Sequence, residues 1–160
     1  MYASQGQEFK RRESSGGRVR SYNDCGKLRE GGSLAEIDRL YQTGIEQMTA
    51  GDLQASIATF TRIIELRPDF AEGWNKRATL YFLTGELRKS LADCDEVVKR
   101  NPYHFGALAG YAQIYTRLQY YERALDYARR ALAVNPNLEA VRRNVELLEH
   151  LLEQRRNQTI

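Results

Sequence analysis

The 160-residue sequence predicts an all-α protein, an α-solenoid built from antiparallel helical hairpins. Three observations lead to this fold class. The three prolines stand at a constant spacing of 34 residues, two columns of small residues repeat with the same period, and the apolar residues of each repeat follow the three-and-four spacing of an amphipathic helix. A repeat of this length accommodates two helices joined by a short turn, so we expect one hairpin per repeat.

Proline and glycine mark the ends of the expected helices. Pro68, Pro102 and Pro136 follow the second helix of each repeat, because proline cannot continue a helix and biases the preceding residue away from the α region. Gly51 and Gly85 fall between the two helices of the first two repeats, where glycine can adopt the left-handed conformation that ends a helix. The acidic residue after each of these glycines places a negative charge at the positive end of the next helix.

Small residues at two positions of each repeat indicate where the paired helices touch. The positions lie twelve residues apart, one in each helix, and helices approach closely there only if neither side chain is bulky. The first column holds Gly44, Ala78 and Ala112, and the second holds Ser56, Ser90 and Ala124.

The periodic part of the chain forms one folded domain over residues 34–155. It comprises three repeats, 37–70, 71–104 and 105–138, and a further amphipathic helix over 138–155. This last helix carries Val141, Val145, Leu148 and Leu152 on one face and is expected to cap the apolar edge of the third hairpin.

The segments outside this domain lack an apolar period. Residues 1–33 are rich in glycine, serine and charged residues, so we expect a disordered N-terminal tail, and 156–160 form a short C-terminal tail. The basic run KRRESSGGRVR in the N-terminal tail is interpreted as a solvated segment, with a basic address or phosphorylation at Ser14 as the alternatives.

Composition excludes several classes of protein. A formal net charge of +3, from 24 basic and 21 acidic residues, argues against sequence-independent nucleic-acid binding, and the apolar runs are too short to span a membrane. The two cysteines, Cys25 and Cys94, show neither a disulfide pattern nor metal-ligand spacing. Because the N-terminus also lacks the apolar stretch of a secretory signal, we expect a cytoplasmic protein, with an intracellular organelle as the alternative.

The sequence offers no catalytic constellation, and we expect a protein that is not an enzyme and uses no cofactor or metal. No HExxH, GxSxG or P-loop string is present, and His104 and His150 are interpreted as ordinary surface residues. Cys94 follows the apolar period and is expected to be buried rather than reactive.

An acidic cluster in the second repeat has a simple structural explanation. Its three residues stand four positions from a basic residue, and such pairs stabilise an exposed helix face. The expected pairs are Lys89–Asp93, Asp95–Lys99 and Glu96–Arg100.

The repeats resemble tetratricopeptide repeats. The first repeat matches the family pattern mainly by spacing, because Thr43 and Gln47 stand where apolar or aromatic residues are usual. The second repeat matches the pattern through Trp74, Leu80, Tyr81, Gly85, Leu91 and Pro102, and the third through Leu108, Ala112, Tyr115, Ala124, Ala131 and Pro136.

The resemblance implies a right-handed superhelix whose first helices line a concave groove that holds a peptide or helix of a partner protein. Tyr41, Met48, Phe82 and Leu83 would supply apolar contacts, and Asn75, Lys76 and Arg117 would orient an acidic partner. Asn144, Leu147 and Leu151 would close the far end of the groove. The expected groove residues are Tyr41, Gln42, Ile45, Met48, Asn75, Lys76, Thr79, Phe82, Leu83, Gln113, Thr116, Arg117 and Arg143.

One branch of the family clamps the C-terminal carboxylate of chaperones with lysine, asparagine and arginine side chains. The matching positions here hold Tyr41, Ile45, Lys76, Gly106 and Gly110, so the clamp is absent and we expect no selective binding of chaperone C-termini. The two glycines either leave room for a ligand's backbone or allow close packing of helices.

Six of the ten tyrosines lie between residues 103 and 127. Tyr111 and Tyr115 follow the apolar period and are expected in the core, whereas Tyr120, Tyr121 and Tyr127 are expected to form a second interaction surface.

The predicted function is that of a non-catalytic protein–protein interaction module. The alternatives are a scaffold that self-associates as a homodimer through its first hairpin and a regulatory subunit of an enzyme complex. RNA binding is disfavoured because the groove lacks regular base-reading side chains and a basic stripe, and neither nucleic acid nor a membrane is an expected partner.

Overall fold

The computed structural model describes residues 21–22, 28–29 and 33–158. The chain divides into two compact units, 1–31 and 32–160. In the first unit, β1 (Ser21–Tyr22) pairs antiparallel with β2 (Leu28–Arg29), and Ser21 lies opposite Arg29. The sequence did not predict these two strands. The rest of the tail that we expected to be disordered lies outside the described residues.

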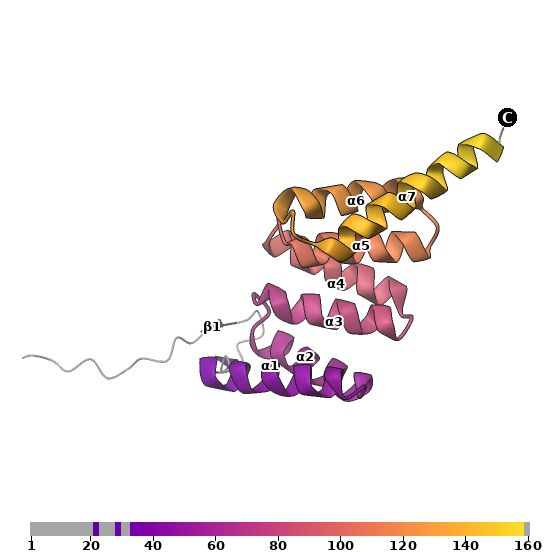
Figure 1. Ribbon diagram of the computed structural model, residues 1–160. Coiled ribbons are helices and arrows are strands. Elements are labelled where there is room, and N and C mark those ends of the chain that lie inside the picture. The colour runs from indigo at the N-terminus through magenta and orange to yellow at the C-terminus, as the bar shows by residue number, and fades with distance from the viewer. Residues whose placement is uncertain (1–20, 23–27, 30–32, 159–160) are drawn as a thin grey trace, which may run out of the picture. The chain divides into compact units, whose positions relative to one another are not determined.

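The second unit is helical, and the predicted fold class is confirmed for it: it is an α-solenoid of antiparallel hairpins. In Figure 1 the hairpins follow one another in chain order, and α7 packs against α6. α7 runs three residues beyond the predicted end of the capping helix, into the segment that we expected to be a tail. The helices are α1 (Leu34–Thr49), α2 (Leu53–Leu66), α3 (Ala71–Leu83), α4 (Leu87–Arg100), α5 (Phe105–Arg117), α6 (Tyr121–Val134) and α7 (Glu139–Gln158).

The turns inside the hairpins share one conformation. Gly51 and Gly85 have φ angles of +83° and +81°, as their predicted role requires. The equivalent residue of the third hairpin is Gln119, which adopts φ +64° although it carries a side chain. The first turn continues into α2 through Asp52, whose side chain accepts a hydrogen bond from the backbone of Ala55.

The small residues lie where the helices of each hairpin meet, as predicted. A Cβ added to Gly44 would lie 2.7 Å from the ring of Phe60, so only glycine fits without a shift. The serines of the second column also form hydrogen bonds that the sequence did not predict. Ser56 donates to the carbonyl of Gly44 at 2.8 Å, and Ser90 donates to that of Ala78 at 2.7 Å.

Three apolar clusters join successive hairpins into one core. The first combines Phe60 of α2 with Leu80 of α3, and the second combines Cys94 of α4 with Ile114 of α5. The third includes Val141 of α7, which packs with buried residues of α5 and α6, as expected of a helix that caps the third hairpin. Cys94 is buried as predicted, and its burial raises the pKa of the thiol to about 12.

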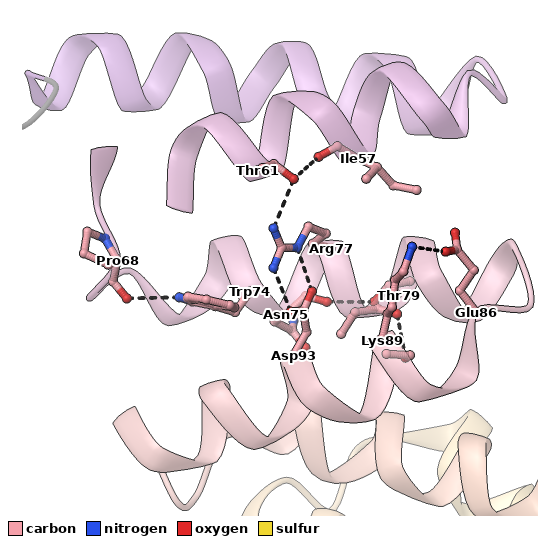
Figure 2. A network of polar contacts seen from close by, with 12 residues as sticks. Ile57, Thr61, Pro68, Trp74, Asn75, Arg77, Thr79, Glu86, Lys89 and Asp93 are labelled. Carbon is pink, nitrogen blue, oxygen red and sulfur yellow. Dashed lines mark hydrogen bonds and ion pairs between the residues drawn. The ribbon is translucent and has the colours of Figure 1, made fainter. Parts of the chain in front are cut away.

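The acidic cluster on α4 differs from the prediction. Asp93 is only 4% exposed and forms a bidentate ion pair with Arg77 of α3, with Nε–Oδ2 and Nη2–Oδ1 distances of 2.8 Å. Figure 2 shows that Arg77 also donates to Thr61 of α2, at 3.0 Å. Asp95 accepts a hydrogen bond from the hydroxyl of Tyr111. The predicted pairs of Asp93 and Asp95 were therefore wrong, because these two side chains turn toward neighbouring helices.

The third predicted pair of α4 is confirmed: Arg100 and Glu96 lie 2.7 Å apart, on a more exposed part of the helix. In the described part of the chain, no buried side-chain nitrogen or oxygen lacks a hydrogen-bond partner. None of the helices there combines the length and apolar character that crossing a membrane requires.

Candidate functional site

A pocket of about 490 Å³ opens between α3, α5 and α7. Four of the predicted groove residues line it: Phe82, Gln113, Thr116 and Arg117. The pocket lies where the first helices of the second and third hairpins meet α7. The other lining residues are Ala109, Ala112, Ala140, Val141 and Asn144.

Arg117 forms the charged wall of this pocket. Its guanidinium carbon lies 5.3 Å from the centre of the Phe82 ring, and its Nη1 donates to the carbonyl of Phe82 at 3.2 Å. These two contacts connect the ends of α5 and α3 and hold the guanidinium in the lining of the pocket. Three small side chains, Ala109 and Ala112 from α5 and Ala140 from α7, also line the pocket, and we call them its alanine floor.

A smaller cavity of about 20 Å³ adjoins the pocket and shares Phe82 and Gln113 with it. Asn75, Thr79, Gly106 and Gly110 also line it, together with buried residues of α3 and α4. Its volume suits a single water molecule rather than a ligand. A Cβ added to Gly110 would lie 3.2 Å from the sulfur of Cys94, and one added to Gly106 would lie 3.0 Å from Asn75, so these glycines serve the packing of helices.

Glu72 of α3 forms a polar hub that includes two more predicted groove residues. Its carboxylate lies 3.3 Å from Lys76 and 3.0 Å from Nε2 of His104, and the Tyr41 hydroxyl makes a long contact to it at 3.5 Å. The ring of Tyr41 packs edge-on against Phe60, with the ring centres 5.7 Å apart. Tyr41 therefore connects the first two hairpins, and Lys76 has its counter-charge within its own helix.

His104 has a structural position that the sequence did not predict. Its side chain is only 14% exposed, and its Nδ1 accepts the backbone N–H of Ala107 at the start of α5, which leaves Nε2 to donate to Glu72. Burial raises the pKa of Glu72, but the hydrogen bond from His104 and the charge of Lys76 outweigh it, so the net pKa lies below its ordinary value. The expectation that His104 is an ordinary surface residue was wrong.

The remaining predicted groove residues are not gathered into one pocket. Ile45 and Met48 are half-buried against the core of the first two hairpins, and Gln42 is exposed. Leu83 is 53% exposed at the end of α3. Arg143 is exposed and outside the pocket, whereas its neighbour Asn144 lines it.

Ala140 and Val141 are pocket residues that the sequence did not assign to the groove. The repeat register could have identified them, because α7 begins at Glu139, which is 34 residues after the start of α5 at Phe105. α7 therefore continues the series of first helices, and its residues on the groove side follow those of α5.

The tyrosines are arranged differently from the prediction. Tyr111 is buried as expected, and Tyr127 stacks on it with ring centres 4.5 Å apart rather than facing outward. Burial and the hydrogen bond to Asp95 raise the pKa of Tyr111. Of the three residues assigned to a second interaction surface, Tyr120 alone is exposed, at 56%. Tyr121 is half-buried beneath Arg155, whose guanidinium lies 4.3 Å from the ring centre.

The stacked hairpins, with a pocket on the side formed by their first helices, define a helical-repeat solenoid protein. Two models of the tetratricopeptide repeat family match the sequence, one over residues 41–105 and the other over 105–138. These matches span all three hairpins and more than half of the chain. The chain belongs to the tetratricopeptide repeat family, which confirms the resemblance.

Known proteins and solved structures agree with this assignment. A TPR repeat-containing protein of Rhizobium etli is 37% identical over 112 residues, which cover 66% of this chain and 52% of that protein. The chain thus spans about half the length of this relative.

Two solved structures show the same fold. The Sgt2 TPR domain from Aspergillus fumigatus has a TM-score of 0.74 at 18% identity, over 81% of this chain and 87% of that one. The first TPR of Spaghetti (RPAP3), bound to the HSP90 peptide SRMEEVD, has a TM-score of 0.71 at 20% identity, over 77% and 98% of the two chains.

Proposed function

We propose that this protein is a non-catalytic interaction module that binds a peptide or helix of a partner protein in the groove formed by α1, α3, α5 and α7. TPR domains generally mediate protein–protein interaction. The observation that carries the proposal is the open pocket at the α5–α7 end of this groove, where Phe82 and Arg117 stand over a floor of alanines. Ligand pockets typically combine an apolar lining with a few polar groups in this way.

Exposed apolar side chains beside the pocket support the same proposal. Leu83 at the end of α3 and Leu147 on α7 are 53% and 51% exposed, on the helices that also line the pocket. Large exposed aliphatic residues next to a pocket are typical of a surface that a partner covers.

We expect a ligand different from that of the Spaghetti domain, whose structure contains an HSP90 peptide. The five positions of the carboxylate clamp hold no matching set here, and Lys76, the only cation among them, is ion-paired with Glu72. The C-terminal carboxylate of SRMEEVD should therefore add nothing to its binding here, and calorimetric titration should give the same affinity for the peptide and for its C-terminal amide. Weaker binding of the amide would contradict the proposed difference.

Affinity capture with matched variants tests the groove. Arg117→Glu reverses the charge of the pocket wall, and Arg88→Glu makes the same change at an exposed position of α4, outside the pocket and the groove helices. A partner bound in the groove should be retained by the natural protein and by Arg88→Glu and lost with Arg117→Glu. Partners that remain bound to Arg117→Glu would place the interface elsewhere.

Self-association and a regulatory role are tested separately. Light scattering that shows only monomer over a wide concentration range would remove self-association through the first hairpin. Purified protein that changes the activity of a captured enzyme, without activity of its own, would support a regulatory subunit. The cytoplasmic location stays a prediction from composition.

A further inference from the structure

We propose that the pocket between α3, α5 and α7 selects a partner segment in which an acidic residue stands beside an aliphatic residue. Arg117 binds the carboxylate, and the alanine floor receives the aliphatic side chain. This inference rests on the proposed function and adds the chemistry of the ligand to it.

The cations along the groove differ in whether the protein itself neutralises them. Lys76 lies 3.3 Å from the Glu72 carboxylate, and Arg77, on the same helix, is bound to Asp93 through two of its guanidinium nitrogens. Arg117, in contrast, forms no ion pair with any carboxylate in the described part of the chain. The pocket therefore carries a positive charge, that of Arg117, which the protein itself does not neutralise.

Phe82 holds the Arg117 side chain in place. One N–H of the guanidinium donates to the carbonyl of Phe82, and the guanidinium carbon lies over the Phe82 ring. A guanidinium has five N–H donors, so four remain for a ligand. Because its position is fixed by Phe82, the group loses little freedom when it binds a planar carboxylate through two parallel hydrogen bonds.

Small apolar side chains line the same pocket as the guanidinium. Ala109, Ala112 and Ala140 contribute to its lining, and its volume is about 490 Å³. Gln113 and Asn144 also line the pocket, and neither side chain makes a hydrogen bond within the described residues. Their amide groups can bind the backbone of a segment whose aliphatic side chain enters the pocket.

The depression on the Tyr115–Tyr127 side of α5 and α6 is less suited to ligand binding. Its walls carry Arg123 next to Glu122 and Asp126, so both signs of charge are already present. Arg123 lies over the ring of Tyr115, and Arg130 lies over that of Tyr127. These rings are therefore occupied by the protein's own cations.

Selection from a random peptide library displayed on phage tests the inference without a known partner. The library is panned in parallel against the natural protein, Arg117→Gln and the control Arg88→Gln, which changes an exposed residue of α4. We expect the natural protein and the control to enrich sequences with Asp or Glu adjacent to Leu, Ile or Val. Arg117→Gln should still enrich aliphatic residues but no longer enrich acidic ones. A circular dichroism spectrum equal to that of the natural protein shows that the variant is folded.

One enriched peptide then gives a direct measure of the contact. Replacing its acidic residue by the matching amide should weaken binding to the natural protein about tenfold or more, and should leave binding to Arg117→Gln nearly unchanged. Equal losses with both proteins would overturn the assignment of Arg117. If Arg117→Gln is misfolded, the acidic peptide and its amide variant are compared on the natural protein at low and high salt. A difference in affinity that does not shrink at high salt overturns the ionic contact.

The outcomes separate this inference from the proposed function. Enrichment of peptides without acidic residues would overturn the acidic selectivity and leave the groove as a binding site. No enrichment above the background of the library would contradict both.

Discussion

Breaking the ion pair between Arg77 and Asp93 should strongly destabilise the protein, although the sequence indicated only a weak surface interaction for Asp93. The two side chains are 14% and 6% exposed, and they are joined by two hydrogen bonds of 2.8 Å. Asp93→Asn retains the shape of the side chain but leaves the guanidinium without its counter-charge. Breaking a buried pair in this way typically costs about 3–5 kcal/mol, because the remaining charge stays desolvated.

The surroundings of Arg77 place the expected loss at the lower end of this range. In the variant, the guanidinium keeps its hydrogen bond to Thr61 and its contacts over the rings of Trp74 and Tyr81, at 5.1 and 5.6 Å from their centres. We therefore expect the free energy of unfolding to fall by about 3 kcal/mol. Urea unfolding followed by circular dichroism measures the change.

Two further variants serve as controls. Glu96→Gln removes a charge from the pair with Arg100, whose side chains are 29% and 25% exposed, and should cost less than about 1 kcal/mol. The double change Arg77→Met and Asp93→Leu removes both charges and should recover most of the loss, since neither partner is left unpaired. A loss for Asp93→Asn no larger than that for Glu96→Gln would refute the reasoning.

Four further perturbations follow from the fold. Gln119→Gly should stabilise the protein by about 0.5–1 kcal/mol, because Gln119 holds φ +64° as a non-glycine residue. Gly85→Ala should destabilise it by about 1 kcal/mol, because Gly85 has a φ of +81°. Thermal melting measures both changes. Truncation after Asn137 should lower the melting temperature, because it uncovers the cluster that Val141 closes; an unchanged midpoint would contradict the capping role. The pKa of Glu72 is lowered in the folded protein, so its contribution to the free energy of unfolding should be full above about pH 4.5 and decline as the pH falls further. Urea unfolding at several pH values measures this decline, which should be smaller in the variant Glu72→Gln.

The repeat pattern predicted the hairpins because its determinants are local. A glycine in the turn, a proline after the second helix and a small residue at each crossing act within one repeat. The partners of Asp93 and Asp95 could not be found from spacing within their own helix, because both lie on neighbouring helices. Thr61–Arg77, Arg77–Asp93 and Asp95–Tyr111 are each separated by 16 residues, which is the offset that brings adjacent helices of the stack together.

The groove could be predicted as a face but not as a pocket. The repeat register assigns Lys76 and Arg117 to the same side of their helices, and it gives both the same expected role. The two side chains differ because Glu72 neutralises the charge of Lys76. Glu72 also binds His104 at the start of the next hairpin. Such a hub depends on the relative placement of three elements, which single-repeat patterns do not contain.

α7 has two roles: it covers the apolar side of the third hairpin, and it lines the pocket. In the register of the first helices, Glu146 follows Gly44, Ala78 and Ala112 in the column of small residues, so a second helix cannot approach α7 as it approaches α1, α3 and α5. The neighbouring side chains on that face are charged and exposed, and Arg142 and Glu149 form ion pairs with Glu139 and Arg129. The groove side of the same helix carries Asn144 next to the buried Val141. Charge on one face therefore closes the repeat series, while the other face supplies the wall against which Arg117 can hold a ligand.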